Sequence, residues 1–303
     1  MIEVVPYAGR PTNYRVTDGR LEAIVTADVG PRVLRLGLVG GPNEFAELPE
    51  VSQPTPYGDW RLYGGHRLWH SPEAMPRSYY PDNDPCTVEV DDDYVSVAQA
   101  VEPPTGIQKT MRLRPGEGFI EVDHVLTNEG LWPIEAAPWA LSVMAPGGTA
   151  LLQPASQRDP QNLLPNRSLI LWPYTDLTDD RLVLGRDLIL LHQRADAAGP
   201  IKVGVNNDGG WAAYYNQGRL FIKRFAVDIF AVYPDNGCTV ECYTNAQMLE
   251  LESLGSLVLL EPGESAYHTE RWYLFEVPHL PLDDEEALLE AVNGHLSRTS
   301  EPG

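Results

Sequence analysis

The sequence has little positive charge and no long apolar run. Its 22 Lys and Arg residues are outnumbered by 43 Asp and Glu residues, which gives a formal net charge of −21. Nucleic acids and anionic membrane surfaces are bound by clusters of Lys and Arg, so we expect neither as a partner. No segment approaches the roughly 18 apolar residues of a membrane-spanning helix. The first residues also lack the charged and apolar regions of a secretory signal peptide.

Cysteine is scarce, which argues against a disulfide framework and a structural zinc site. The chain has three cysteines, and the pair Cys238 and Cys242 is accompanied by no second pair and no paired-histidine motif. This content is typical of a reducing compartment, so we expect a cytoplasmic protein with no resident metal or cofactor. The sequence leaves the oligomeric state open.

Short alternating segments make up most of the chain. The 26 Gly and 27 Pro residues are spread throughout and indicate turns. Between them lie runs rich in β-branched and aromatic residues with a period of two, such as 21–27, 94–98 and 119–126. In such runs alternate side chains point to opposite faces of a sheet. The sequence predicts an all-β fold with two large antiparallel sheets, in one domain that spans residues 1–303.

One helix is predicted, over residues 281–297. Its first turn contains Asp283, Asp284, Glu285 and Glu286, which suit the positive N-terminal end of a helix dipole. Apolar residues then recur with a period of 3.6, so the helix should pack on the outside of a sheet. We expect residues 298–303 to form a frayed tail.

The segment 63–73 has the composition of a carbohydrate site. Its distinctive residues are Gly64, Gly65, His66, Arg67, Trp69, His70 and Glu73. Glycine lets a ligand approach the backbone closely, a Trp ring offers an apolar face to a sugar, and Arg and Glu exchange hydrogen bonds with hydroxyl groups. In the alternative interpretation, the Trp fills the core and the Arg and Glu form a local ion pair.

A metal site is a further alternative for the same segment. His66, His70 and Glu73 offer suitable ligand atoms. The spacing of the two histidines suits a helix, but the glycine pair before them and Pro72 after them disfavour one.

Two acidic residues share one face of a later predicted strand. Glu250 and Glu252 alternate with Leu249 and Leu251. If this face lines a cavity, burial and mutual repulsion would raise the pKa of one carboxyl, as general acid–base catalysis requires. If it faces solvent, the pair is ordinary surface charge.

Two other residues are candidates for the same cavity. Trp139 lies in an apolar strand after the turn at Asn128, where it either contacts a ligand or fills the core. Lys223 lies on a predicted strand next to an aromatic-rich strand, and we expect it to reach the cavity.

Together these segments resemble the galactose mutarotase-like superfamily, a large β-supersandwich that includes the aldose 1-epimerases, and more narrowly the DUF4380 family. The resemblance spans roughly residues 14–277. It rests on Gly64-Gly-His-Arg-Leu-Trp69 with Pro72-Glu73, Leu126-Thr-Asn128 with Pro138-Trp139, Leu249-Glu-Leu-Glu252, Pro262-Gly263-Glu264 and Trp272-Tyr-Leu-Phe275.

The resemblance implies a saccharide ligand and the opening of a pyranose ring. In the family, a Glu near the C-terminus removes the proton of the anomeric hydroxyl while a mid-chain His protonates the ring oxygen. Glu252 or Glu250 matches the base. The family acid lies in a His-Pro-Tyr motif, but the corresponding segment here reads Ala137-Pro138-Trp139, so His66 and His70 become the candidate acids. The expected sugar contacts are Arg67, Trp69, Glu73, Trp139 and Lys223.

Three functions follow from this reading. The first is an aldose 1-epimerase-like isomerase. The second is a non-catalytic carbohydrate-recognition domain, which needs no proton-transfer pair. The third is a metal-dependent sugar-processing enzyme that uses His66, His70 and Glu73.

Overall fold

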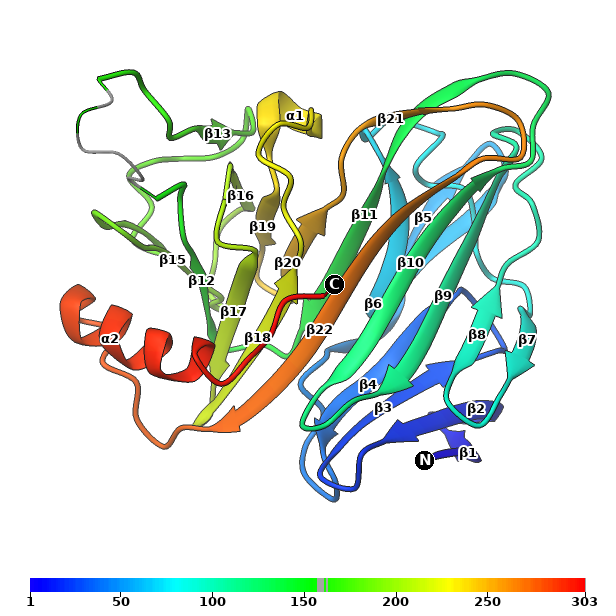
Figure 1. The fold of residues 1–303 in the computed structure, drawn as a ribbon, viewed down its shortest axis with the longest axis horizontal. Helices are drawn as coiled ribbons and strands as arrows, with labels where there is room; N and C mark the ends of the chain where they lie inside the picture. Colours follow the sequence, from blue (N-terminus) through cyan, green and yellow to red (C-terminus); the bar gives the residue numbers. More distant parts are fainter. Residues whose placement is uncertain (157–160, 162, 303) are drawn as a thin grey trace.

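The computed structural model describes residues 1–156, 161 and 163–302. Nearly all of its regular structure is strand, in two large antiparallel sheets that pack against each other (Figure 1). The predicted fold class is confirmed. Neither helix in this part of the chain is long and apolar enough to cross a membrane.

The larger sheet has twelve strands in the described chain, ten of them along its main path. In spatial order these are β1 (Ile2–Tyr7), β2 (Arg10–Thr17), β3 (Leu21–Thr26), β4 (Arg32–Leu38), β6 (Gly58–Ser71), β11 (Ile134–Met144), β20 (Leu249–Leu254), β19 (Val240–Thr244), β16 (Ile201–Val205) and β13 (Leu169–Leu171). Two further strands extend it, β5 (Glu47–Thr55) beside β6 and β21 (Val258–Leu260) beside β11.

The smaller sheet has ten strands in the same described ranges. In spatial order these are β14 (Leu182–Leu184), β15 (Ile189–His192), β12 (Thr149–Leu152), β17 (Trp211–Asn216), β18 (Arg219–Phe225), β22 (Ser265–Glu276), β10 (Ile120–Asn128), β9 (Ile107–Pro115), β8 (Val95–Ala98) and β7 (Thr87–Val90).

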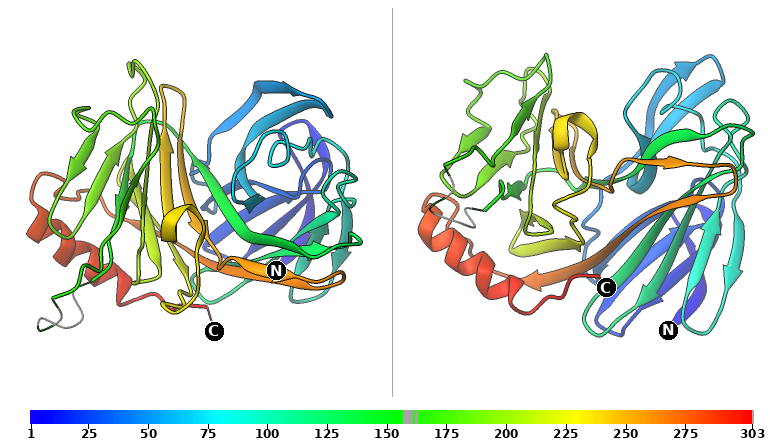
Figure 2. Two further views of the ribbon diagram at one scale, coloured as in Figure 1. Left: turned by 90° about the horizontal axis from the view of Figure 1, so that it is seen from above. Right: turned by 45° about the horizontal axis from the view of Figure 1, so that its top comes forward.

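The predicted C-terminal helix is present as α2 (Glu285–Leu296), which begins four residues later than predicted. The start is set by Asp284, whose carboxylate accepts a hydrogen bond from the backbone N–H of Ala287 at 3.1 Å. The helix lies along the outside of the smaller sheet (Figure 2). It buries Leu288 and Val292 in an apolar cluster with outward-facing side chains of that sheet. Residues 298–302 continue along β22, where Arg271 Nη1 donates to the carbonyl of Glu301 at 2.7 Å; residue 303 lies outside the described residues.

A single turn, α1 (Pro234–Gly237), adds to the one helix predicted from the sequence. It is not a regular helix, because Asp235 and Asn236 have positive φ angles of 50° and 61°. These residue types tolerate the left-handed region, which is why the sequence signals a turn here.

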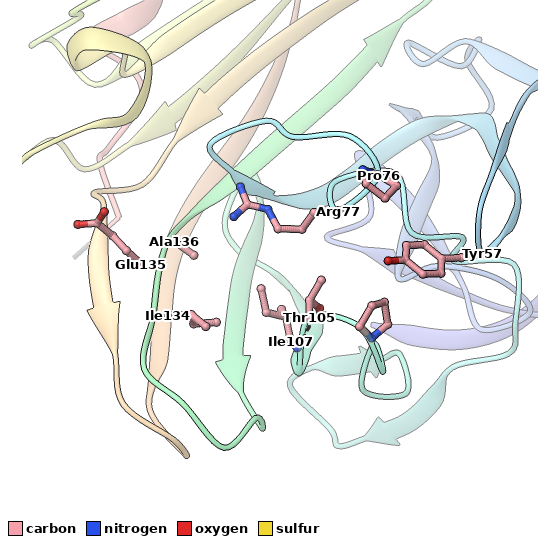
Figure 3. A pocket seen from close by; sticks show the side chains of 9 residues that line it. Tyr57, Pro76, Arg77, Thr105, Ile107, Ile134, Glu135 and Ala136 are labelled. Atoms are coloured by element: carbon pink, nitrogen blue, oxygen red, sulfur yellow. Dashed lines mark hydrogen bonds between the residues drawn. The ribbon is translucent and has the colours of Figure 1, made fainter.

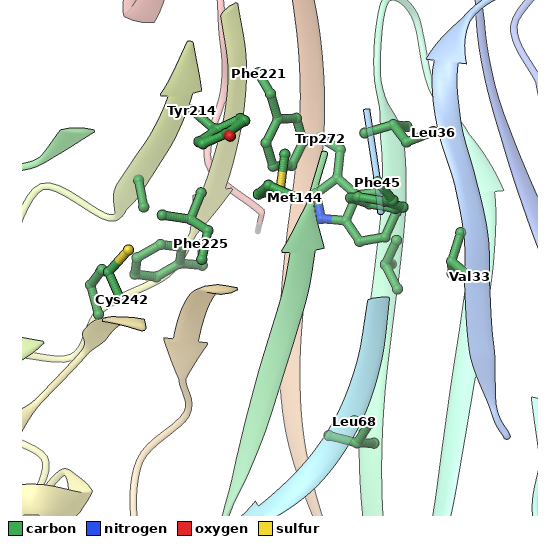
Figure 4. Packing of buried hydrophobic residues seen from close by; sticks show 14 of the residues in the cluster. Val33, Leu36, Phe45, Leu68, Met144, Tyr214, Phe221, Phe225, Cys242 and Trp272 are labelled. Carbon is green, nitrogen blue, oxygen red and sulfur yellow. The ribbon is translucent and has the colours of Figure 1, made fainter. Parts of the chain in front are cut away.

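The main core lies between the two sheets and follows the period of two. Along β10, for example, buried and half-buried residues alternate from Ile120 to Asn128. The centre of the core is aromatic, because Phe45 and Phe221 both pack edge-on against Trp272 (Figure 4). Burial of these apolar side chains supplies the main driving force for packing the sheets together.

β6 changes direction in its middle, and this change positions the candidate site. Tyr63, Gly64 and Gly65 have positive φ angles of 55°, 87° and 72°. The residues before this kink pair with β5, and those from Gly65 onward pair with β11. At Gly65 a Cβ atom would lie 2.2 Å from the carbonyl oxygen of Val33, so only glycine fits there.

A chain of hydrogen bonds crosses the core at three buried histidines. His124 Nδ1 donates to the carbonyl of His268 at 2.8 Å, so His124 Nε2 accepts from His66 Nε2 at 2.6 Å. His66 Nδ1 then accepts from the hydroxyl of Ser142 at 2.8 Å. Burial lowers the pKa of all three histidines, which suits neutral rings.

A buried ion pair lies beside these histidines. Lys223 Nζ is 2.8 Å from Glu270 Oε1, and both side chains are fully buried. Trp272 Nε1 donates to the other carboxylate oxygen at 2.6 Å, and Ser253 also donates to Glu270. The ligand atoms of His66, His124 and Glu270 are close enough to hold a metal ion, but each already has a hydrogen-bonding partner within the network.

We predict that Gly65→Ala destabilises the fold by at least about 2 kcal/mol, because the new Cβ meets the Val33 carbonyl and the positive φ is strained. Gly294→Ala is the matched control. Gly294 lies in α2 with open space around it, so alanine should stabilise by up to about 1 kcal/mol. Urea unfolding measures both changes, and equal midpoints for the two variants would contradict the prediction.

We predict that Lys223→Met lowers the free energy of unfolding by about 3–5 kcal/mol, because it leaves the Glu270 charge buried without its partner. The double variant Lys223→Met/Glu270→Gln should recover part of this loss. Chemical denaturation of the wild type and both variants tests the pair, and a loss below about 1 kcal/mol in the single variant would count against it.

Candidate functional site

The face of the larger sheet that points away from the core carries a polar and aromatic cluster. It is built on β6, β11, β20, β19 and β16, which are neighbours in the sheet. Register places Trp69 opposite Trp139, Glu250 opposite Tyr243, and Glu241 opposite Glu252. Because side chains alternate along a strand, the apolar neighbours of these residues point into the core instead.

Two adjoining hollows open over this cluster. One has a volume of about 340 Å³ and the other about 290 Å³. They share four lining residues, Glu73, Tyr79, Trp139 and Lys202, and we refer to both together as the groove. Its other polar and aromatic lining residues are Trp172, Asp235 and Glu241 on one side, and Gln53, Trp60, Arg67, Trp69, Tyr174, Tyr243, Asn245 and Glu250 on the other.

Aromatic rings form the floor of the groove. The ring of Trp69 packs edge-on against Trp139, with 5.4 Å between centroids, and against Tyr79 at 4.9 Å. Trp60 packs against both Trp69, at 5.6 Å, and Tyr79, at 5.4 Å. These contacts fix the rings, so their apolar surface is held ready for a ligand with C–H groups.

Arg67 and Glu250 form an ion pair at the side of the groove. Arg67 Nη2 lies 2.7 Å from Glu250 Oε1, and the guanidinium stacks over Trp69 at 4.6 Å from the ring centroid. Arg67 Nε and Nη1 are buried and have no hydrogen-bonding partner among the described residues. Such donors are costly to bury unsatisfied, so they fit a ligand that brings acceptor oxygens.

Lys202 links two carboxylates at the other side of the groove. Its Nζ lies 2.8 Å from Glu241 Oε2 and 3.0 Å from Glu252 Oε2. The rings of Trp139 and Trp172 flank the ammonium at 4.5 and 4.6 Å. Burial opposes the charge, but the two carboxylates outweigh it and raise the pKa of Lys202 well above its ordinary value.

The two carboxylates held by Lys202 are both fully buried, but they differ in what borders them. Glu241 lines the groove, whereas Glu252 does not and accepts a hydrogen bond from Trp139 Nε1 at 2.8 Å. Burial raises the pKa of Glu241, and the nearby carboxylates of Glu252 and Asp235 raise it further. Lys202 lowers it, and the resulting pKa is about 8. Glu252 Oε1 and both oxygens of Glu241 have no hydrogen-bonding partner in the described chain, although Glu241 Oε2 is in ion-pair contact with Lys202.

The groove brings together five of the predicted site residues, which are Arg67, Trp69, Glu73, Trp139 and Glu250. Glu252 lies just below it. The rings of Trp69 and Trp139 are buried, as the alternative interpretation that they fill the core predicts. They also line the groove. Arg67 pairs with Glu250 and not with Glu73, which accepts from the hydroxyl of Tyr79 at 2.6 Å.

The other three predicted residues lie between the two sheets, away from the groove: His66 and His70 on β6 of the larger sheet, and Lys223 on β18 of the smaller sheet. His66 and His70 alternate with Arg67 and Trp69 along β6, so they point between the sheets. His70 Nε2 lies 3.3 Å from buried Glu102, which also pairs with Lys109 at 2.6 Å. Lys223 belongs to the Glu270 ion pair. Because His66 and His70 point between the sheets and Glu73 lines the groove, these three residues do not form the predicted metal site.

Sequence analysis missed Lys202, Glu241, Tyr79 and Trp172. Lys202 and Glu241 are charged residues inside otherwise apolar strands, β16 and β19, and both are buried. A charged residue within a short apolar run was the available signal, because burial of such a residue requires a partner.

A further hollow of about 290 Å³ lies near the other end of β11 (Figure 3). Its lining includes Tyr57, Arg77, Thr105, Ile134 and Glu135. It contains none of the predicted site residues and none of the buried carboxylates of the groove.

No protein-family model and no curated protein matches the sequence. Solved structures do match. The Slr1438 protein of Synechocystis is 12% identical with a TM-score of 0.57, and the match covers 91% of this chain and 100% of that one. A Klebsiella pneumoniae protein provisionally named an aldose 1-epimerase is 12% identical with a TM-score of 0.56, over 99% and 89%.

A galactose mutarotase-like protein from Lactobacillus casei is 9% identical with a TM-score of 0.51, and that match covers 87% of this chain and 100% of the other. At such identities a structural likeness establishes the fold and no more. With its two antiparallel sheets and single C-terminal helix, this chain has the β-supersandwich fold of the galactose mutarotase-like proteins.

Proposed function

We propose that the groove binds a saccharide and that the protein is an aldose 1-epimerase-like isomerase. The observation that carries this proposal is the combination, on one face of the sheet, of fixed aromatic rings, unsatisfied guanidinium donors and carboxylates. A sugar ring offers apolar C–H faces to the rings and hydroxyl groups to the polar atoms. The names of the similar Klebsiella and Lactobacillus proteins support the same class of ligand.

The sugar contacts in this proposal are Arg67, Trp69, Glu73 and Trp139, which line the groove. Arg67 has two unsatisfied donors for hydroxyl oxygens. Glu73 accepts from Tyr79 and has a second oxygen for a sugar hydroxyl. Such fixed donors and acceptors orient the ring over the aromatic floor.

Glu250 is the base in this proposal. It lines the groove, whereas Glu252 does not line it and is bound by Trp139 Nε1 and Lys202. The contact with Arg67 Nη2 at 2.7 Å fixes the position of the Glu250 carboxylate. Glu250 removes the proton of the anomeric hydroxyl, and the ring opens as the electron pair moves to form the carbonyl.

One observation favours the second candidate, a non-catalytic recognition domain. None of the described residues that line the groove is a histidine. A recognition domain uses the same aromatic and Arg contacts without any proton transfer, so the two candidates differ in turnover and not in binding.

We predict that Trp172→Ala weakens saccharide binding about tenfold or more, because it removes an aromatic surface from the groove. Trp132→Ala is the matched control, since Trp132 is 76% exposed and is not among the residues that line the groove. Calorimetric titration with a panel of aldoses measures both variants. A panel in which no sugar binds the wild type would contradict both candidate functions.

We predict that the wild type accelerates anomer exchange of a freshly dissolved aldose, followed by proton NMR, and that Glu250→Gln lowers kcat by about 10²-fold or more. Glu290→Gln, an exposed position on α2, should leave the rate unchanged. Binding without any acceleration by the wild type would identify a recognition domain. An unchanged rate in Glu250→Gln would remove this residue as the base.

A further inference from the structure

One carboxyl of the groove, Glu241, takes no part in the base chemistry. It lines the groove from β19, and its residue exposure is 0%. Its Oε1 has no hydrogen-bonding partner in the described part of the chain. A buried carboxyl with a free oxygen is costly, so its position on the wall of a groove calls for a functional explanation.

Glu241 and Glu250 are placed to act on one ligand. Glu241 lies opposite Glu252 in the register of β19 and β20, and Glu250 is two residues before Glu252. The two groove carboxyls are therefore diagonal neighbours on one face, at a separation of about 7–8 Å between their backbone positions. Lys202 and Trp139 line both hollows and connect the two positions.

The two carboxyls of the groove have different neighbours. Arg67 contacts Glu250 at 2.7 Å. The titratable and charged groups around Glu241 are Lys202 on β16, Glu252 on β20, Asp235 in α1 and Cys238 directly after it. Burial and the charges of Glu252 and Asp235 outweigh Lys202 and raise the pKa of Glu241 to about 8, which suits a group that donates a proton.

We propose that Glu241 is the general acid of this groove and protonates the ring oxygen of the sugar. The assignment rests on the proposed isomerase function. Glu250 removes the proton from the anomeric hydroxyl, the C1–O5 bond breaks as the carbonyl forms, and O5 takes the proton from Glu241. The open-chain aldehyde is thus formed with no net gain or loss of protons.

The same residues complete the cycle. After the carbonyl rotates, O5 attacks C1 from the other face, Glu241 takes back the O5 proton, and Glu250 returns its proton to the carbonyl oxygen. Both carboxyls then regain their starting states. Lys202 and Glu252 act as positioning residues, since Lys202 contacts Glu241 and is held in turn by Glu252.

The test compares Glu241→Gln with the wild type and with the Glu290→Gln control. Gln has the shape of a protonated carboxyl but cannot deliver the proton. We expect Glu241→Gln to bind the same aldose within about threefold of the wild type by calorimetric titration, while kcat for anomer exchange falls by about 10²–10⁴-fold. A wild-type rate in Glu241→Gln would overturn the acid assignment and leave the isomerase function intact.

The pH profile of the unchanged protein gives an independent test. Because Glu241 must be protonated to act, kcat should fall as pH rises through about 8. Glu241→Gln should lose this alkaline limb. A flat wild-type profile between about pH 6 and pH 9.5 would overturn the assignment, whereas no acceleration at any pH would overturn the isomerase function and the acid together.

Stability provides a check that does not depend on turnover. The pKa of Glu241 is raised in the folded protein, so its contribution to stability is present below the unfolded value and is lost as pH rises through about 8. Glu241→Gln should therefore unfold at a higher temperature than the wild type at pH 9. An unchanged or lower midpoint at that pH would contradict the raised pKa on which the acid assignment depends.

Discussion

The period of two along β6, β11, β20 and β19 is the constraint on which the structure depends. Each of these strands is buried on both faces, one against the core and the other against the groove. On β20, Leu251 points into the core between Glu250 and Glu252. A shift of one residue in register would turn the core-facing side chains toward the groove and the groove-facing side chains toward the core. Burial of the apolar side chains in the core therefore also fixes which residues line the groove.

A charged side chain on a buried strand needs a partner of opposite charge. Lys202 on the larger sheet pairs with Glu241 and Glu252, and Lys223 on the smaller sheet pairs with Glu270 between the sheets. The low dielectric that makes an unpaired charge costly also strengthens the effect of each neighbour on protonation. Glu241, with Lys202, Glu252 and Asp235 around it, therefore has a raised pKa because of its burial and its neighbours.

The fold alone does not decide between an isomerase and a recognition domain, because similar scaffolds support different chemistry. The groove holds aromatic surface and hydrogen-bonding groups, which both candidate functions use. The isomerase that we propose differs in giving a role in proton transfer to the buried Glu241 and to Glu250, which is paired with Arg67.

The sequence by itself determined the all-β class, the C-terminal helix and the shared face of Glu250 and Glu252, because strand and helix periods are local properties. It also singled out Arg67, Trp69 and Trp139 from short segments of distinctive composition, and all three line the groove. Only the tertiary structure decided which face of β6 lines the groove, and so placed His66 in the core. It also joined Lys202 to Glu241 and Glu252, since the pairing of β16, β19 and β20 depends on contacts between distant parts of the chain.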